Sequence, residues 1–164
     1  MIDEQLRHRA AHILEQARRR GIRIATAESC TGGLIAAVLT EIPGSSDVVE
    51  RGFVTYSNDA KMELLGVPRS TLDSAGAVSR ETALAMAAGA IVHSHAHVAV
   101  AVTGVAGPGG GSAEKPVGLV HLAVARAGRE PRHREMRYGD IGRSHVRAAT
   151  VHTALEMLGE AIET

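Results

Sequence analysis

The feature that most constrains the fold is an unbroken apolar run, Val98-Ala99-Val100-Ala101-Val102, inside a predicted strand over residues 97–103. A strand with one face in water alternates apolar and polar residues, whereas this run is apolar on both faces. It therefore predicts a central strand covered on both sides by other elements. Because aromatic residues are only 2% of the 164 residues, we expect a core of alanine, valine, leucine and isoleucine.

Helix and strand patterns alternate along the rest of the chain. An apolar face formed by Leu6, Ala10, Ile13, Leu14 and Ala17 predicts a first helix over residues 3–20. Further helices are expected at residues 34–40, 57–64, 80–92 and 143–162, further strands at 22–26, 48–56, 117–125 and 132–138, and a loop at 66–76. Ser79 is the expected N-cap of the helix at 80–92. The length fits one domain, residues 1–164, and the order predicts an α/β fold with a mixed sheet flanked by helices.

A short polar turn, residues 27–33, joins the strand at 22–26 to the next helix. A tight turn between a strand and a helix directs backbone N–H groups toward whatever lies above it. The turn holds two candidate nucleophiles, Ser29 and Cys30. A serine hydroxyl needs a base to react, and a lone cysteine is more often a small buried apolar residue. The turn by itself leaves both candidates open, as well as a simple capping role for Ser29.

Lys61 is the candidate base. With Ser57 as the N-cap of the helix at 57–64, Lys61 falls near the helix N-terminus, where the helix dipole disfavours a cation. The dipole lowers the lysine pKa by less than about one unit, so burial must supply the rest of any shift toward a neutral amine. A neutral lysine can accept a serine proton, as in Ser–Lys hydrolases. Tyr56 lies just before this helix and could assist through its hydroxyl.

Two further segments indicate a small anionic ligand. The glycine-rich residues 104–115 could bring backbone N–H groups close to an anion, although they lack the signature of a P-loop. Thr103 should face the same crevice as Ser29 if their strands are parallel. Arg143 and Arg147 are four residues apart, hence on one helical face, and could clamp a phosphate. A flexible lid and a solvated basic stripe are the alternatives for these segments.

Composition excludes several classes of protein. Eighteen basic and eighteen acidic side chains give a net charge of zero, which argues against a broad nucleic-acid-binding surface. No apolar run approaches the roughly 20 residues that span a bilayer, so no membrane partner is expected. His93, His95 and His97 straddle a helix–strand junction without a cysteine or carboxylate cluster, so we expect no metal. One cysteine and no signal-peptide pattern favour the cytoplasm.

Several segments, taken in order, resemble the CinA C-terminal domain family over nearly the whole chain. They are Thr26-Ala27-Glu28-Ser29-Cys30-Thr31-Gly32-Gly33, Gly52-Phe53-Val54-Thr55-Tyr56-Ser57-Asn58, Gly76-Ala77-Val78-Ser79, Gly104-Val105-Ala106-Gly107-Pro108, Gly110-Gly111-Ser112 and Lys115-Pro116-Val117-Gly118. The resemblance implies a three-layer α/β/α sandwich with a mixed, mostly parallel central sheet. It also implies hydrolysis of nicotinamide mononucleotide (NMN) to nicotinate mononucleotide and ammonia, because stand-alone members are NMN deamidases of pyridine nucleotide recycling. Full-length relatives carry an additional N-terminal nucleotide-hydrolase domain.

The resemblance implies a Ser–Lys mechanism without cofactor or metal, in which Ser29 is the nucleophile, Lys61 the base and Tyr56 an assistant. We expect backbone N–H groups at Thr31 to Gly33, or in the Gly104 loop, to stabilise the oxyanion. We expect the substrate to be contacted by Glu28, Thr31, Gly32, Gly33, Ser46, Thr103, Gly104, Gly107, Gly110, Arg143 and Arg147. An acidic residue is common in the family at the position of Gly109, so loop contacts to the substrate could differ. The family also implies a homo-oligomer.

Two alternatives to this assignment stay open on sequence alone. Within enzymes, Cys30 could be a thiolate nucleophile, and Ser46 is a further candidate for a supporting or nucleophilic hydroxyl. Outside enzymes, the chain could be a non-catalytic nucleotide-binding or regulatory module of the CinA family. The presence of Ser29, Tyr56 and Lys61 together argues against that module.

Overall fold

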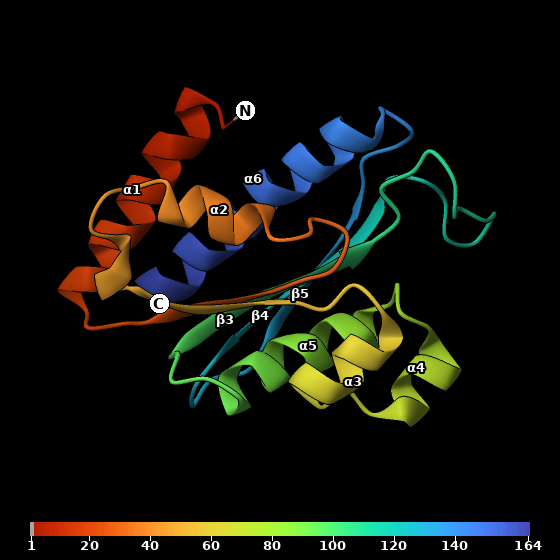
Figure 1. The fold of residues 1–164 in the computed structure, drawn as a ribbon, viewed down its shortest axis with the longest axis horizontal. Helices are drawn as coiled ribbons and strands as arrows, with labels where there is room; N and C mark the ends of the chain where they lie inside the picture. The colour runs from red at the N-terminus through yellow and green to blue at the C-terminus, as the bar shows by residue number, and fades with distance from the viewer. Residues whose placement is uncertain (1) are drawn as a thin grey trace.

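The run of alternating valine and alanine forms β3 (Val98–Gly104), the middle strand of a five-stranded sheet. The computed structural model describes residues 2–164. One helical layer, α1, α2 and α6, covers one face of the sheet, and α3, α4 and α5 cover the other (Figure 1). The predicted three-layer α/β/α sandwich is therefore confirmed.

The other elements follow the predicted order with two additions, a 3₁₀ turn before β2 and α4. They are α1 (Glu4–Arg19), β1 (Ile24–Glu28), α2 (Leu34–Thr40), a 3₁₀ turn (Ser45–Asp47), β2 (Val49–Val54), α3 (Asn58–Leu65), α4 (Arg69–Ala75), α5 (Arg80–Val92), β4 (Leu119–Arg126), β5 (Arg132–Arg137) and α6 (Arg143–Glu163). The strand order is β2-β1-β3-β4-β5. β1 pairs in parallel with β2 and β3, while β4 is antiparallel to both of its neighbours. Four strands thus run in one direction and β4 runs in the other.

The two sheet faces carry side chains of different size. On β3, Val98, Val100 and Val102 face the core under α1, α2 and α6, whereas Ala99 and Ala101 face the core under α5. All five are fully buried, as two covered faces require. Because alanine side chains are short, the α5 layer can lie close to the sheet, and small residues fill that side of the core.

Close packing of α5 extends to its contact with α3. Gly89, inside α5, lies against the backbone of Leu65 at the end of α3. A Cβ atom at position 89 would lie 1.9 Å from the Leu65 carbonyl oxygen, closer than any real contact. Glycine at this position therefore lets α3, which carries Lys61, pack against the helix that covers the sheet.

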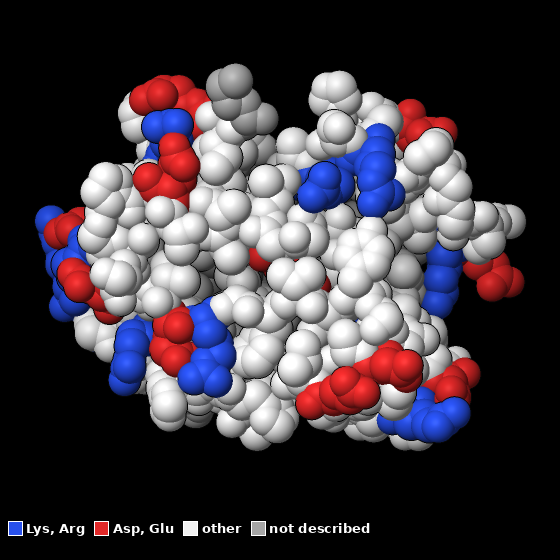
Figure 2. Space-filling model, viewed as in Figure 1, with Lys and Arg blue, Asp and Glu red and all other residues white. Residues whose placement is uncertain are grey.

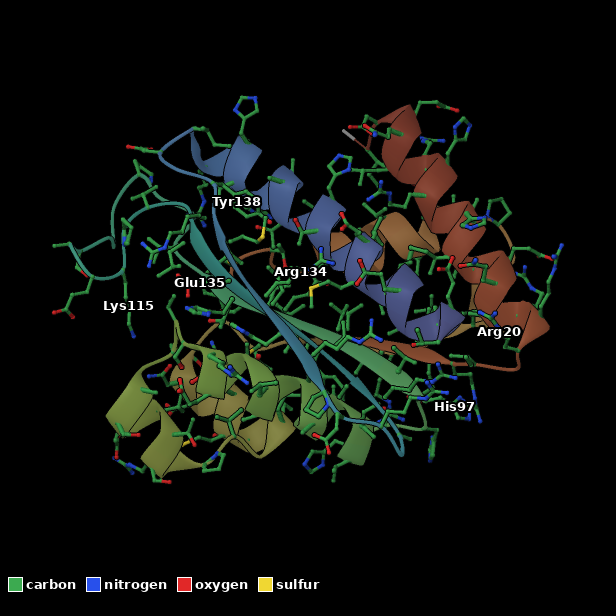
Figure 3. The ribbon with its side chains drawn as sticks, turned by 180° about the vertical axis from the view of Figure 1, so that it is seen from behind. Arg20, His97, Lys115, Arg134, Glu135 and Tyr138 are labelled. Atoms are coloured by element: carbon green, nitrogen blue, oxygen red, sulfur yellow. The ribbon has the colours of Figure 1, made fainter. Side chains whose placement is uncertain are left out.

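Polar contacts attach α6 to the edge strand β5. Arg134 on β5 donates hydrogen bonds to Glu156 (2.8 Å) and Glu160 (2.6 Å) of α6. The Tyr138 hydroxyl lies between β5 and α6, 2.6 Å from Thr153 Oγ1 (Figure 3). These contacts attach α6 along β5, and its N-terminal end contacts the segments that follow β1 and β3, because Arg147 donates to the Thr31 carbonyl and Arg143 to the Gly107 carbonyl.

Four predictions about the elements need correction. The strand expected at 22–26 lies at Ile24–Glu28, so the first two residues of the turn expected at 27–33 belong to β1. Residues 66–76 are not only a loop, because they contain α4, which begins after Pro68 and buries only Leu72. A helix with one buried apolar residue has no periodic pattern to detect. The strand expected at 48–56 ends at Val54, because the chain leaves the sheet where Thr55 and Tyr56 turn their carbonyls toward Lys61. The strand expected from residue 117 begins at Leu119.

Within residues 2–164, none of the helices has the length and apolar character needed to cross a bilayer.

The predicted helix caps are present: Ser57 accepts a hydrogen bond from the Ala60 amide, and Ser79 accepts one from the Thr82 amide. The Ser57 cap fixes where α3 begins and hence the position of Lys61 near its N-terminus.

The close contact at Gly89 generates a stability prediction. Gly89→Ala should lower the free energy of unfolding by roughly 1–3 kcal/mol, because α3 and α5 must separate to admit the methyl group. Gly159→Ala in α6 is the matched control, since its Cβ would meet only Ile13 at an ordinary 3.8 Å. That control should be neutral or stabilising by up to about 1 kcal/mol. Urea denaturation measures both, and equal effects would contradict the packing argument.

Candidate active site

The turn at residues 27–33 lies where the parallel strands β1 and β3 end side by side. The Ser29 amide donates to the Val102 carbonyl (3.1 Å), so Ser29 continues the β1–β3 ladder by one residue. Consecutive strand residues face opposite sides of a sheet, and Ser29 accordingly faces the α3 layer. Ser29 is 9% exposed, at the inner end of a cavity.

Lys61 lies against Ser29. Its Nζ atom is 3.0 Å from Ser29 Oγ, 2.7 Å from the carbonyl oxygen of Thr55 and 3.2 Å from that of Tyr56. Sequence reasoning placed these two side chains in one site, and the structure brings the hydroxyl within reach of the amine. The carbonyls of Thr55 and Tyr56 leave the sheet at the end of β2, and they hold the amine in place.

Burial sets the ionisation of Lys61. The side chain is 1% exposed, although α3 as a whole lies near the surface. Burial lowers the pKa of Lys61 from its ordinary 10.5, and the nearby Cys30 opposes this effect. The helix N-terminus, which the sequence pointed to, is therefore not the main cause. The shift is in the direction that a general base requires.

A cavity of about 280 Å³ opens above the Ser29–Lys61 pair. Its wall is formed by Ser29, Cys30, Tyr56, Lys61, Ala77, Val78, Thr103, Gly104, Val105, Ala106, Gly107, Gly109, Gly110 and Arg143. Thr103 faces this crevice, and its hydroxyl donates to the Ala77 carbonyl (2.8 Å). The cavity thus draws on the ends of β1 and β3, on α3, on the glycine-rich connection and on α6.

The mouth of the cavity is bridged by Arg143. One guanidinium nitrogen donates to the Gly107 carbonyl (2.8 Å), and another donates to the Tyr56 hydroxyl (2.8 Å). Tyr56 is 58% exposed and contributes two groups to the site, its carbonyl to Lys61 and its hydroxyl to Arg143. An anion at the mouth would therefore meet a guanidinium that is already oriented.

Arg147 lies one helical turn beyond Arg143 on the same face of α6, as predicted. It does not line the cavity with Ser29, because its Nη2 atom donates to the Thr31 carbonyl (2.9 Å). Figure 2 shows a basic patch over the beginning of α6, on a face with few other charges near its centre. The structure thus separates the two arginines: Arg143 faces the cavity and Arg147 supports the turn.

Glu28 is fully buried and does not reach the cavity. Its carboxylate accepts hydrogen bonds from the Thr31 hydroxyl (2.6 Å) and from the amides of Ile35 (2.8 Å) and Ala36 (3.0 Å). The expectation that Glu28 contacts the substrate is corrected, because its oxygens are occupied inside the protein. Thr31, Gly32 and Gly33 also lie outside the cavity wall.

Backbone amides around the cavity differ in their availability. The Gly32 amide donates to the Ser29 carbonyl (3.0 Å), and the first amides inside α2 bind Glu28. The amides expected from Thr31 to Gly33 as an oxyanion site are thus partly used within the turn. Cys30, Ala106 and Gly107 line the cavity, so their amides are the better candidates for an oxyanion site.

Ser46 lies far from the site. It belongs to the 3₁₀ turn before β2, whereas Ser29 lies beyond the carboxyl ends of the parallel strands. The length of β2, roughly 17 Å at about 3.3 Å per residue, separates the two ends. The structure therefore corrects the expectation that Ser46 contributes a hydroxyl to this site.

Cys30 lines the cavity, but its environment opposes reactivity. Its side chain is 5% exposed and packs in the core under α1, α2 and α6. Burial raises the pKa of the Cys30 thiol to about 11, so the protonated form prevails near neutral pH. A protonated thiol is a poor nucleophile, and the geometry favours Ser29.

Sequence reasoning missed the groups that act through their backbone. The carbonyls of Thr55 and Tyr56 hold Lys61, and the segment with Ala77 and Val78 forms one wall of the cavity. Lys115, from the glycine-rich connection, donates to the Ala75 carbonyl (2.7 Å) and points toward the α4 layer (Figure 3). Every residue type has a backbone carbonyl, so no sequence signal could reveal that the carbonyls of Thr55 and Tyr56 hold Lys61.

The histidines do not form a metal site. In the part of the chain that the structure describes, no group of three or more His, Cys, Asp or Glu side chains is arranged to hold a metal ion. His97 Nδ1 accepts a hydrogen bond from the Arg23 amide, and His95 lies beside Glu50. The His95 and His97 side chains thus make separate local contacts.

The sequence of this chain matches the CinA C-terminal domain over residues 6–162. The chain belongs to the CinA family. A CinA-like protein from Syntrophus aciditrophicus is 51% identical over 158 residues, and one from Chloroherpeton thalassium is 57% identical over 114 residues. These matches cover 95% and 70% of this chain but only 36% and 27% of those CinA-like proteins. The chain thus spans about a third or less of the length of these curated relatives.

Solved structures of CinA-family proteins share the fold over the whole domain. A crystal structure of a competence/damage inducible protein from Agrobacterium tumefaciens is 59% identical, with a TM-score of 0.97. The match covers 100% of this chain and 99% of that one. A competence damage-inducible protein from Klebsiella pneumoniae is 34% identical with a TM-score of 0.90, over 94% of this chain and 95% of that one.

The lowered pKa of Lys61 predicts a pH dependence of stability. The unfolded chain binds the Lys61 proton up to about pH 10.5, whereas the native state releases it at lower pH. The free energy of unfolding should therefore rise with pH between the native pKa and 10.5, and Lys61→Met should lose this rise. Ser29→Ala, which keeps the lysine, should retain it. Denaturant titrations from about pH 8 upward measure the slopes; equal slopes for wild type and Lys61→Met would contradict the burial argument.

Proposed function

We propose that this chain is an amidase that hydrolyses NMN to nicotinate mononucleotide and ammonia, by a Ser29–Lys61 mechanism. The reaction class rests on the contact between Ser29 and the buried amine, and the substrate rests on the resemblance to stand-alone CinA-family deamidases. A role in pyridine nucleotide recycling in the cytoplasm follows from that substrate.

The observation that carries the proposal is the set of three contacts around Lys61 Nζ. A neutral amine has two N–H bonds and one lone pair. The carbonyls of Thr55 (2.7 Å) and Tyr56 (3.2 Å) can accept both N–H bonds, which leaves the lone pair to Ser29 Oγ at 3.0 Å. This arrangement is the one in which Lys61 accepts the serine proton.

In the first half of the reaction, Ser29 Oγ attacks the carboxamide carbon of NMN while its proton passes to Lys61. The carbonyl oxygen becomes an oxyanion, and cavity-lining amides of Cys30, Ala106 and Gly107 are the candidate donors to it. The C–N bond then breaks, and the leaving nitrogen takes the proton from Lys61 to depart as ammonia. The product of this half is a nicotinoyl ester on Ser29.

In the second half, water replaces ammonia. Lys61, neutral again, accepts a proton from a water molecule that attacks the ester carbon. The bond to Ser29 Oγ breaks and the serine recovers its proton from Lys61, which releases nicotinate mononucleotide. The same amine thus acts as base and acid in turn, with its position fixed throughout by the carbonyls of Thr55 and Tyr56.

The mouth of the cavity supports a nucleotide rather than a free amide. With the carboxamide at Ser29, the ribose and 5′-phosphate would extend toward Arg143 and the glycine-rich connection, which line the same cavity. Arg143 is exposed and already oriented by Gly107 and Tyr56, so it can form hydrogen bonds to a phosphate. Gly110 also lines this part of the cavity.

Variants of the two reacting residues test the mechanism. Ser29→Ala and Lys61→Arg should each lower ammonia release from NMN by roughly 10³-fold or more, because nucleophile and base act as a unit. Cys30→Ala should keep near wild-type turnover, since the thiol is protonated. For wild type, kcat should rise with pH as Lys61 loses its proton and level off above its lowered pKa. Normal turnover by Lys61→Arg, or loss of turnover in Cys30→Ala, would contradict the assignment of Lys61 as the base and Ser29 as the nucleophile.

A comparison of substrates tests the nucleotide specificity. NMN should be hydrolysed with a higher kcat/KM than nicotinamide or NAD, because nicotinamide has no phosphate for Arg143 and NAD extends beyond the mouth. Arg143→Gln should lower the ratio of kcat/KM for NMN to kcat/KM for nicotinamide by about 10-fold or more. Ammonia release is the readout, with isothermal titration for binding. Binding of NMN without any ammonia release would instead favour a non-catalytic nucleotide-binding module.

A further inference from the structure

Glu28 is a carboxylate with 0% exposure, buried directly before the proposed nucleophile. The three hydrogen bonds that it accepts come from uncharged donors, Thr31 Oγ1 at 2.6 Å and the amides of Ile35 and Ala36 at 2.8 and 3.0 Å. Burial of a carboxylate is costly unless such donors satisfy it. In most helices the side chain of the N-cap residue accepts a hydrogen bond from one of the first backbone amides. The N-cap of α2 is Gly33, which has no side chain, so Glu28 accepts these hydrogen bonds instead.

Glu28 precedes Ser29 and Cys30 in the chain, and all three of its donors follow them. Glu28 is the last residue of β1, Thr31 follows the two candidate nucleophiles, and the amides belong to the first turn of α2. One carboxylate therefore joins the strand end to the helix start across the turn. Two backbone hydrogen bonds also hold the turn: the Ser29 amide donates to the Val102 carbonyl, and the Gly32 amide donates to the Ser29 carbonyl.

The alternation of strand side chains links this contact to the site. Glu28 points toward the α2 layer, so Ser29, the next residue, points toward the α3 layer, where Lys61 lies. Cys30 follows on the α2 side and packs in the core there. Loss of the Glu28 contacts would release Thr31 and the start of α2 from the strand end, and a shift of the turn would move the Ser29 hydroxyl relative to the Lys61 amine.

We propose that Glu28 is a positioning residue, which directs Ser29 toward Lys61 and keeps the neighbouring Cys30 unreactive. The first part rests on the proposed function, because it concerns the efficiency of the Ser29–Lys61 pair. The second part concerns a thiol in the free protein and is independent of any substrate.

Charge supports the second part of the proposal. Burial is the main cause that raises the pKa of the Cys30 thiol, and the charge of Glu28 adds to it, whereas Arg147 and Lys61 act in the opposite direction. Tyr138 from the end of β5 is the other titratable group near the thiol. The causes that act on Lys61 are burial and Cys30. Removal of the Glu28 charge should therefore change the pKa of the Cys30 thiol more than the pKa of Lys61.

Glu28→Gln tests the proposal, because glutamine keeps the shape of the side chain while it removes the charge and one acceptor. We expect kcat for NMN to fall by about 10- to 100-fold with KM within about threefold of wild type, as misplacement of a nucleophile predicts. The pH at which kcat rises should be the same in Glu28→Gln as in wild type, because the pKa of Lys61 determines it. Thr31→Val, which removes one donor and keeps the charge, should lower kcat in the same direction without activating the thiol.

Iodoacetamide alkylation of the free protein measures the thiol. The chain has one cysteine, so mass spectrometry reports Cys30 alone. Glu28→Gln should raise the alkylation rate at a fixed pH by about threefold or more, since the rate follows the thiolate fraction. Asp3→Ala, at the N-cap of α1, is the control for lost capping, because Asp3 accepts the Leu6 amide and does not line the Ser29 cavity. It should lower stability without changing kcat or the alkylation rate.

Each outcome decides one part. Wild-type kcat in Glu28→Gln, or a loss of kcat that Asp3→Ala reproduces at equal loss of stability, would overturn the positioning role. An unchanged alkylation rate in Glu28→Gln would overturn the effect on Cys30. If the wild-type protein releases no ammonia from NMN, the proposed function fails, and the alkylation rates still decide whether Glu28 controls the thiol.

Discussion

The site depends on the burial of one amine among oxygen acceptors. Lys61 is 1% exposed, and its Nζ atom meets Ser29 Oγ and the carbonyls of Thr55 and Tyr56. Removal from water disfavours the charged amine, while the carbonyls fix its direction. β2 must end at Val54 for these carbonyls to turn inward, and α3 must begin directly after Ser57 for the lysine to reach them. The boundaries of β2 and α3 thus determine the contacts of a single side chain.

The unequal faces of the sheet make this burial possible. Large side chains fill the core under α1, α2 and α6, and alanines line the side under α5. Because α5 lies close to the sheet, α3 can pack against it through Gly89 and still place Lys61 at the end of β1. The aliphatic core that the low aromatic content predicts is therefore also the reason that a lysine can be covered so near the surface.

Sequence patterns predicted the parts of the structure that residue types determine. The valine–alanine run located the central strand, Ser57 and Ser79 located two helix starts, and Ser29 with Lys61 located the centre of the site. The pattern could not reveal α4, because one buried residue, Leu72, gives no period. It placed Glu28 at the substrate because a carboxylate in a polar turn has the same sequence signature whether it faces outward or caps a helix from within. The carbonyls that hold Lys61 were invisible for a similar reason, since every residue has one.

The exposed position of Tyr56 has a practical consequence. The chain contains no tryptophan and two tyrosines, Tyr56 and Tyr138. Tyr138 lies between β5 and α6 and bonds to Thr153, whereas Tyr56 stands at the mouth of the cavity with its hydroxyl on Arg143. The intrinsic fluorescence of the unmodified protein therefore comes from one phenol inside the structure and one at the entrance of the site. The entrance phenol is a built-in optical reporter of whatever approaches Arg143.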